Sequence, residues 1–154
     1  MNRRRYLSVA GLAACGMAAG CLDAGSADSE SDLPSGVAAE TVVEDLDAPW
    51  GLAFLDGTWL AITERDEGRL LLVDREEGTT RDIDGVPAVD SAGQGGLLDV
   101  TTHPEFPDEP WLYLTYSAAN DAGETTTHLG RGRLDIEAAS LSAFEVLHRA
   151  EPFL

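Results

Sequence analysis

Residues 59–74 read W-L-A-I-T-E-R-D-E-G-R-L-L-L-V-D, in which two apolar runs are separated by a short polar turn. The second run, Arg69–Asp74, is continuously apolar between charged ends, which is typical of a strand buried on both faces. The intervening Asp66–Gly68 is typical of a tight turn, because glycine accepts backbone angles that most residues avoid. The stretch therefore predicts two strands joined by a turn.

The same pattern of short strands and turns extends to both sides of this stretch. Asp56-Gly57 predicts a hairpin turn that connects Trp50–Leu55 to the strand beginning at Trp59. On the other side, the turn Glu76–Gly78 precedes a strand over Thr79–Ile83. Short strands at this spacing predict an all-β fold, which is a sandwich, a barrel or a propeller.

A second group of strands follows further along the chain. We expect strands at Gly95–Thr102, Trp111–Ser117, Thr125–Leu134 and Phe144–His148, with an acidic loop over Ala118–Glu124. Asp135–Ser142 is compatible with either a helical turn or a loop.

The two groups align with each other. Pro49–Phe54 corresponds to Gly95–Val100, and Trp59–Thr63 corresponds to Trp111–Thr115. Each unit spans about 45 residues, near the period of a four-stranded propeller blade. Two blades do not close a ring, since propellers have typically 4 to 8. We therefore expect residues 40–154 to form an incomplete β-propeller, which is either the N-terminal part of a longer protein or the product of a broken reading frame.

The first residues are typical of an export signal. Residues 1–20 carry Arg3–Arg5 and then a stretch without charge, and the order of residues resembles a twin-arginine signal. A short interfacial anchor that stays attached is the alternative. Cys21 follows small residues that resemble a lipoprotein cleavage box, with Cys15 as the rival, so we expect Cys21 to be lipidated and the protein to be held at the cell surface or released outside the cell. Residues 21–39 are acidic and small, which predicts a flexible linker.

The chain carries 28 acidic and 10 basic residues, for a net charge of −18, and all basic residues are arginine. This charge argues against nucleic acid or anionic membranes as electrostatic partners, so any membrane contact is expected through the lipid anchor only. Since 44% of the residues are hydrophobic, we interpret the acidity as adaptation of a folded protein to high salt.

An ordered set of motifs over residues 41–117 resembles the soluble glucose and aldose sugar dehydrogenases that depend on pyrroloquinoline quinone (PQQ). The motifs are Leu46–Phe54, Ile62–Arg65, Gly68–Leu70, Gly85–Val89, Gly93–Val100, His103–Phe106 and Trp111–Ser117. The resemblance implies a six-bladed propeller with PQQ in a central cleft, and calcium as a further cofactor. It also implies that the substrate is an aldose, whose C1 hydroxyl is oxidised to give a lactone, and that an external acceptor takes up the electrons.

Gln94 is the candidate cofactor-binding residue. The resemblance implies that the glutamine of its glycine-rich motif contacts the quinone, and an amide offers both a donor and an acceptor for such a contact. Gly93, Gly95 and Gly96 permit unusual backbone angles and close approach. The alternative is a turn glutamine that faces water.

Other polar residues are interpreted structurally. Glu64 and Arg65 are expected to form a structural pair that lines the propeller channel. His103 is expected in a turn with a hydrogen-bonded imidazole, whereas His128 and His148 have no nearby ligand cluster. We assign no catalytic and no metal-binding residue, because the histidine base implied by the resemblance belongs to a later motif that does not occur here. The fragment alone is therefore expected to be inactive.

Two other functions stay open at this level. A non-catalytic propeller that binds sugars or proteins at the cell surface fits the same export signal, because propellers host many functions. A metal-dependent propeller of the lactonase type is a weaker alternative, because no ligand cluster is present.

The interpretation of the acidity makes a testable prediction. Carboxylate repulsion is screened to about 3 Å in molar salt, so the folded state should gain stability there. We expect the Tm of the full-length protein to rise between dilute buffer and molar salt. An unchanged Tm would contradict adaptation to high salt.

Overall fold

The computed structural model describes residues 37–152, and the fold lies within the unit that begins at Ala39. The expected export signal, Cys15, Cys21 and most of the expected linker lie outside the described residues. Within residues 37–152, no helix is long and apolar enough to cross a membrane.

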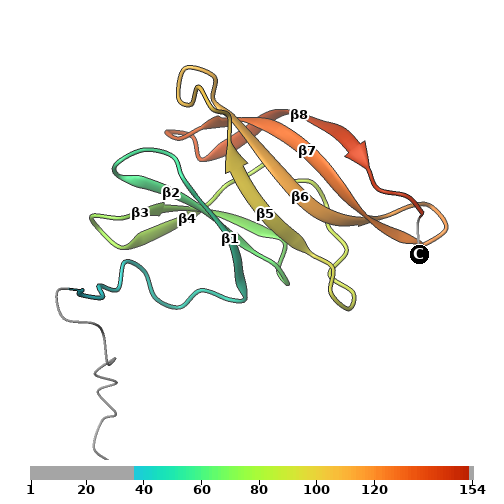
Figure 1. Ribbon diagram of the computed structural model, residues 1–154, viewed down its shortest axis with the longest axis horizontal. Coiled ribbons are helices and arrows are strands. Elements are labelled where there is room, and N and C mark those ends of the chain that lie inside the picture. The colour runs from blue at the N-terminus through green and yellow to red at the C-terminus, as the bar shows by residue number, and fades with distance from the viewer. Residues whose placement is uncertain (1–36, 153–154) are drawn as a thin grey trace, which may run out of the picture. The chain divides into compact units, whose positions relative to one another are not determined.

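The first of two sheets contains four antiparallel strands in the order in which they occur in the chain (Figure 1). Its strands are β1 (Pro49–Phe54), β2 (Trp59–Glu64), β3 (Arg69–Asp74) and β4 (Thr79–Asp82). The predicted hairpin turn joins β1 to β2, where the Asp56 carboxylate accepts hydrogen bonds from the backbone N–H groups of Thr58 and Trp59, both at 2.7 Å. These bonds fix the turn and thereby the register of the two strands.

The second sheet repeats this plan. Its strands are β5 (Leu97–Thr102), β6 (Trp111–Ala119), β7 (Thr125–Asp135) and β8 (Ser140–Arg149), again antiparallel and in chain order. The sequence repeat is confirmed, because its aligned segments are the first and second strands of each sheet. Within the segment Asp135–Ser142, residues 136–139 form the tight turn between β7 and β8, in which the Ala138 N–H donates to the Asp135 carboxylate at 2.9 Å, and Ser140–Ser142 begin β8. The last strand is longer than the predicted Phe144–His148.

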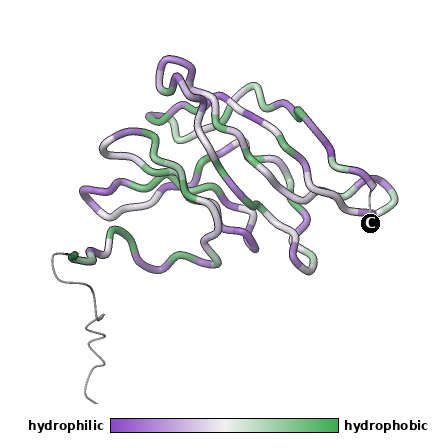
Figure 2. Tube along the Cα trace, viewed as in Figure 1, coloured by the Kyte–Doolittle hydropathy of each residue, from purple (hydrophilic) through white to green (hydrophobic). Residues whose placement is uncertain are grey.

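One apolar cluster joins the two sheets. Leu70 and Leu72 of the first sheet are fully buried in it together with Leu97, Leu112 and Leu114 of the second. Figure 2 shows apolar stretches on the inner strands of both sheets. Burial of each such side chain contributes about 1.5–3 kcal/mol, so this cluster is the main force that holds the sheets together.

The other face of the first sheet is also covered. Val42, Val43 and Leu46 of the extended segment before β1 pack against its second cluster. That cluster consists of Leu60, Ile62, Leu71 and Val73. Burial on both sides explains why β3 is apolar at consecutive positions.

The two sheets meet closely at β1 and β5. The Thr63 hydroxyl, which is fully buried on β2, accepts the Gly51 N–H at 2.7 Å and donates to the Leu98 carbonyl at 2.5 Å. A Cβ on Gly51 would lie 2.8 Å from the Asp99 carboxylate and 2.9 Å from its Cα. Only glycine therefore permits this approach of β1 to β5.

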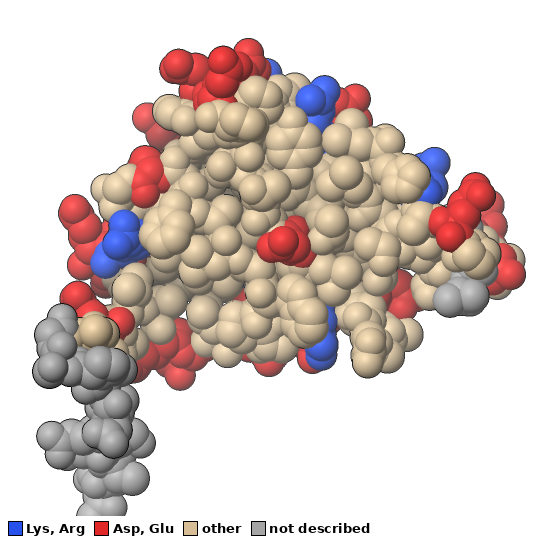
Figure 3. All heavy atoms as spheres, in the orientation of Figure 1, with Lys and Arg blue, Asp and Glu red and all other residues tan. Residues whose placement is uncertain are grey.

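Acidic side chains gather along the margins of the visible face, with few basic ones among them (Figure 3). Five of the seven arginines in residues 37–152 lie over aromatic rings. These contacts are Arg65 on Trp50, Arg75 on Phe54, Arg81 on Trp59, and both Arg131 and Arg133 on Trp111. Each arginine thus covers apolar surface as well as carrying charge.

We expect Thr63→Val to destabilise the full-length protein by about 1–3 kcal/mol, because it leaves a buried N–H and a buried carbonyl without their partner. Urea denaturation measures the change. Thr79→Val on the exposed edge strand β4 is the matched control and should change stability by about 0.5 kcal/mol or less. Equal midpoints for the two variants would contradict the structural role of the Thr63 hydroxyl.

Candidate functional site

Gln94 lies in the loop between β4 and β5 and is exposed. This loop crosses from the outer strand of the first sheet to the inner strand of the second (Figure 1). The position of the Gln94 side chain therefore depends on the hydrogen bonds between this loop and the two sheets.

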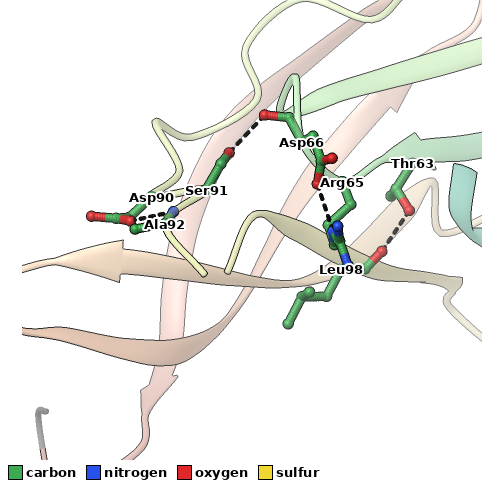
Figure 4. A network of polar contacts seen from close by, with 7 residues as sticks. All are labelled: Thr63, Arg65, Asp66, Asp90, Ser91, Ala92 and Leu98. Atoms are coloured by element: carbon green, nitrogen blue, oxygen red, sulfur yellow. Dashed lines mark hydrogen bonds and ion pairs between the residues drawn. The ribbon is translucent and has the colours of Figure 1, made fainter. Parts of the chain in front are cut away.

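On one side, the loop is bonded to the turn between β2 and β3. The Ser91 hydroxyl donates to the Asp66 carbonyl at 2.7 Å, and the Leu97 N–H donates to the Arg65 carbonyl at 3.1 Å. Figure 4 shows the Ser91 and Asp66 contact beside the bond from Thr63 to Leu98. These bonds fix this end of the loop to the first sheet.

On the other side, the loop is bonded to β6. The Asp90 N–H donates to the Ser117 carbonyl at 2.8 Å, and the Ser117 N–H donates to the Gly96 carbonyl at 2.9 Å. Within the loop, the Asp90 carboxylate accepts the Ala92 N–H at 2.8 Å. The loop that carries Gln94 is therefore bonded both to the turn between β2 and β3 and to β6.

The glycines next to Gln94 have different roles. Gly96 has a φ of +124°, and a Cβ there would overlap the Arg65 carbonyl. Gly93 has a φ of +63°, but a Cβ there would meet no atom within 4 Å. Gly96 is therefore required for contact between the sheets, whereas Gly93 is required only for its backbone angle.

Gln94 lines a groove of about 390 Å³ at the end of the second sheet. The groove is lined by Asp90, Ala92, Gln94, Gly95, Leu98, Ser117, Thr125, Thr126, Thr127 and Pro152. Thr125, Thr126 and Thr127 were not predicted from the sequence as part of a site, because a run of threonines in a strand is equally typical of a solvated face. A contact between Gln94 and a quinone stays a prediction.

The expected pairing of Glu64 with Arg65 is wrong. Glu64 is fully buried and pairs instead with Arg69 at 2.5 Å, while its other oxygen accepts the Asp47 N–H at 2.7 Å. Arg65 binds the Asp66 carboxylate at 2.6 Å and lies over the Trp50 ring. The reason is strand register, because Glu64 and Arg69 lie directly opposite each other where β2 and β3 pair. The turn over residues 65–68 joins the two strands and thereby determines this register.

The histidines have structural surroundings. The prediction for His103 is confirmed, since its Nδ1 accepts the Glu105 N–H at 3.2 Å within a turn. His128 is buried edge-on against Tyr116, and burial together with the charge of Arg149 lowers the pKa of His128. Among the described residues, no group of three or more histidine, cysteine or acidic side chains is placed to hold a metal ion.

Two four-stranded antiparallel sheets, each wound in chain order and joined by one core, are consecutive blades of a β-propeller. Residues 46–154 match the family model described as Glucose / Sorbosone dehydrogenase, and the chain belongs to that family.

Relatives within this family are longer than the chain. The aldose sugar dehydrogenase YliI of Escherichia coli is 38% identical over 122 residues, which are 79% of this chain and 33% of that protein. Quinoprotein glucose dehydrogenase B of Acinetobacter calcoaceticus is 30% identical over 83 residues, which are 53% of this chain and 17% of that protein. The chain therefore spans about a third or less of the length of these relatives.

Solved structures agree with the fold. The apo form of the soluble aldose sugar dehydrogenase from Escherichia coli has a TM-score of 0.69 at 38% identity, covering 75% of this chain and 33% of that one. The PQQ-bound form of aldose sugar dehydrogenase from Streptomyces coelicolor has a TM-score of 0.65 at 30% identity, covering 73% of this chain and 33% of that one. The described sheets are thus part of a propeller.

Two substitutions test how the Gln94 loop is held. We expect Gly96→Ala to lower the stability of the full-length protein more than Gly93→Ala, which should cost about 1–2 kcal/mol for its left-handed backbone. Gly96→Ala adds an overlap with the Arg65 carbonyl to the same kind of backbone cost. Urea midpoints measure both variants, and a larger loss for Gly93→Ala would contradict the account of the loop.

Proposed function

We propose that this chain forms two blades of a PQQ-dependent aldose dehydrogenase, which oxidises the C1 hydroxyl of a sugar to a lactone and passes electrons to an external acceptor. Membership of the Glucose / Sorbosone dehydrogenase family supports this proposal. The observation that carries it on the molecule is the position of Gln94, which lines a polar groove and lies in a loop bonded to both sheets.

The described residues fit PQQ in part. The Gln94 amide suits a quinone oxygen, because it donates and accepts hydrogen bonds. PQQ also carries carboxylates, which require basic partners, and no arginine or histidine is among the ten residues that line the groove. When bound, PQQ would accept the hydride from the sugar. We propose that the basic groups, the catalytic base and the residues that hold calcium belong to the part of the relatives that this chain does not match.

We also propose that the protein is exported through its N-terminal signal, tethered by a lipid on Cys21 and adapted to high salt. The composition supports these proposals, since the acidic surface leaves a lipid as the means of membrane attachment. A tether at the cell surface suits an enzyme that passes electrons to an external acceptor.

The test uses the full-length protein with added PQQ and calcium, and it follows dye reduction with aldoses. Gln94→Ala should weaken PQQ binding by about 10-fold or more, because one hydrogen bond to a charged or polarised group contributes about 1.5–3 kcal/mol. PQQ binding is followed by its absorbance. Glu137→Ala, in the exposed turn between β7 and β8, is the control and should bind PQQ normally.

Absence of activity with every aldose would overturn the dehydrogenase assignment and favour a propeller that only binds sugars or proteins. Activity with unchanged PQQ affinity in Gln94→Ala would keep the reaction but remove Gln94 from the cofactor site.

A further inference from the structure

We propose that Ser91 is a positioning residue, whose hydroxyl holds the Gln94 loop against the first sheet and thereby sets the direction of the Gln94 amide toward PQQ. Gln94 contacts the cofactor, whereas Ser91 acts only through Gln94. This inference rests on the proposed function for the identity of the cofactor. The hold of Ser91 on the loop is a property of the described residues alone.

The first sheet supplies none of the ten residues that line the groove. These ten residues belong to the loop before β5, to β5, β6 and β7, and to the segment after β8. The first sheet therefore influences Gln94 through its contacts with the loop. Two of these contacts come from the turn between β2 and β3.

This turn is bonded to the loop on both sides of Gln94. Before Gln94, the Ser91 hydroxyl donates to the Asp66 carbonyl at 2.7 Å (Figure 4). After Gln94, the Leu97 N–H donates to the Arg65 carbonyl at 3.1 Å. Only the first of these bonds can be removed by a change of side chain, since the second joins two main-chain groups.

The acceptor of the Ser91 bond belongs to a turn that has contacts of its own. The Arg65 Nε donates to the Asp66 carboxylate at 2.6 Å, and the guanidinium lies over the Trp50 ring on β1. These contacts hold Asp66 from the side of the first sheet, so the Ser91 hydroxyl bonds to a carbonyl with a defined position.

Two consecutive residues of the loop join the two sheets. The Asp90 N–H donates to a carbonyl of β6 at 2.8 Å, while the Ser91 side chain bonds to the first sheet. The Asp90 carboxylate accepts the Ala92 N–H at 2.8 Å, and the Gly95 N–H donates to the Ala92 carbonyl at 2.9 Å. Because these bonds close a short turn around Gln94, a displacement of Ser91 also displaces Gln94.

The Gln94 side chain takes its direction from this backbone. It is exposed, and it makes no hydrogen bond to any residue among residues 37–152. A hydrogen bond from its amide to a ligand weakens steeply when the angle is poor. Without the Ser91 bond, a smaller share of the molecules presents the amide in the binding direction, and the apparent affinity falls in proportion to that share.

The experiment is a double-mutant cycle in the full-length protein, with PQQ affinity followed by absorbance. Ser91→Ala should weaken PQQ binding about 3-fold or more, which is the effect of losing one ordinary hydrogen bond. Ser91→Thr keeps the hydroxyl and should restore the affinity. In the Gln94→Ala background, Ser91→Ala should cause no further loss, because the amide that Ser91 positions is absent. Ser142→Ala, which removes an exposed hydroxyl from β8, is the control and should bind PQQ normally.

A second measurement needs no cofactor. Hydrogen-exchange mass spectrometry of the peptide that covers residues 90–97 should show exchange about 3-fold faster or more in Ser91→Ala than in the wild type, with Ser91→Thr close to the wild type. The urea midpoint of Ser91→Ala should stay near that of the wild type, because Ser91 is exposed. A loss of affinity without a loss of stability separates positioning from a general structural role.

The outcomes separate this inference from the proposed function. Unchanged PQQ affinity in Ser91→Ala, or a loss in the double variant equal to the product of the two single losses, would overturn Ser91 as a residue that acts through Gln94. Absence of PQQ binding by the wild type, or unchanged affinity in Gln94→Ala, would overturn the cofactor contact of the proposed function and with it the effect of Ser91 on PQQ. In that case, faster exchange in Ser91→Ala would still support the hold of Ser91 on the loop, and unchanged exchange would overturn it.

Discussion

The Thr63 hydroxyl is the contact on which the arrangement of the two blades depends. It joins three strands at once, because it bonds to the Gly51 backbone on β1 and to the Leu98 carbonyl on β5 while it sits on β2. Apolar burial is not directional, so the shared core alone would permit the sheets to slide against each other. The short hydrogen bond from Thr63 to the Leu98 carbonyl restricts this sliding, together with the bond from the Leu97 N–H to the Arg65 carbonyl, and these bonds set the position of β5.

The position of β5 in turn determines where the Gln94 loop lies. The loop enters β5 directly and is bonded to both sheets, so a change in their relative position would move the amide. This explains why the glycine with the most restrictive surroundings, Gly96, lies where the loop contacts the Arg65 carbonyl. The site is thus a consequence of how the blades pack and belongs to neither blade alone.

The strands and turns were predictable from the sequence because their signals are local. Asp56-Gly57, the continuous run of β3 and the paired tryptophan segments each specify their own structure within a few residues. The partner of Glu64 was predicted wrongly as Arg65, because the pairing with Arg69 depends on register across a hairpin. The cover over β2 and β3 was also missed, since Val42 and Val43 pack there without forming a strand.

The candidate site divides in the same way. Gln94 stands out because glycines surround it and because its motif resembles a family. The rest of the groove lining does not, because residues such as Ser117 and Thr127 become neighbours only when β6 and β7 pair. A site whose parts come from two strands and a loop is visible only after the chain has folded.

The arginines that lie over aromatic rings give this lysine-free chain a way to keep large rings at its surface. A planar guanidinium that stacks on a ring shields one side of that ring. A neighbouring molecule then contacts a cation on that side instead of an exposed indole or phenyl group. This shielding requires direct contact between the guanidinium and the ring, so it depends little on ionic strength. The few cations among residues 37–152 thereby shield aromatic surface in addition to carrying positive charge.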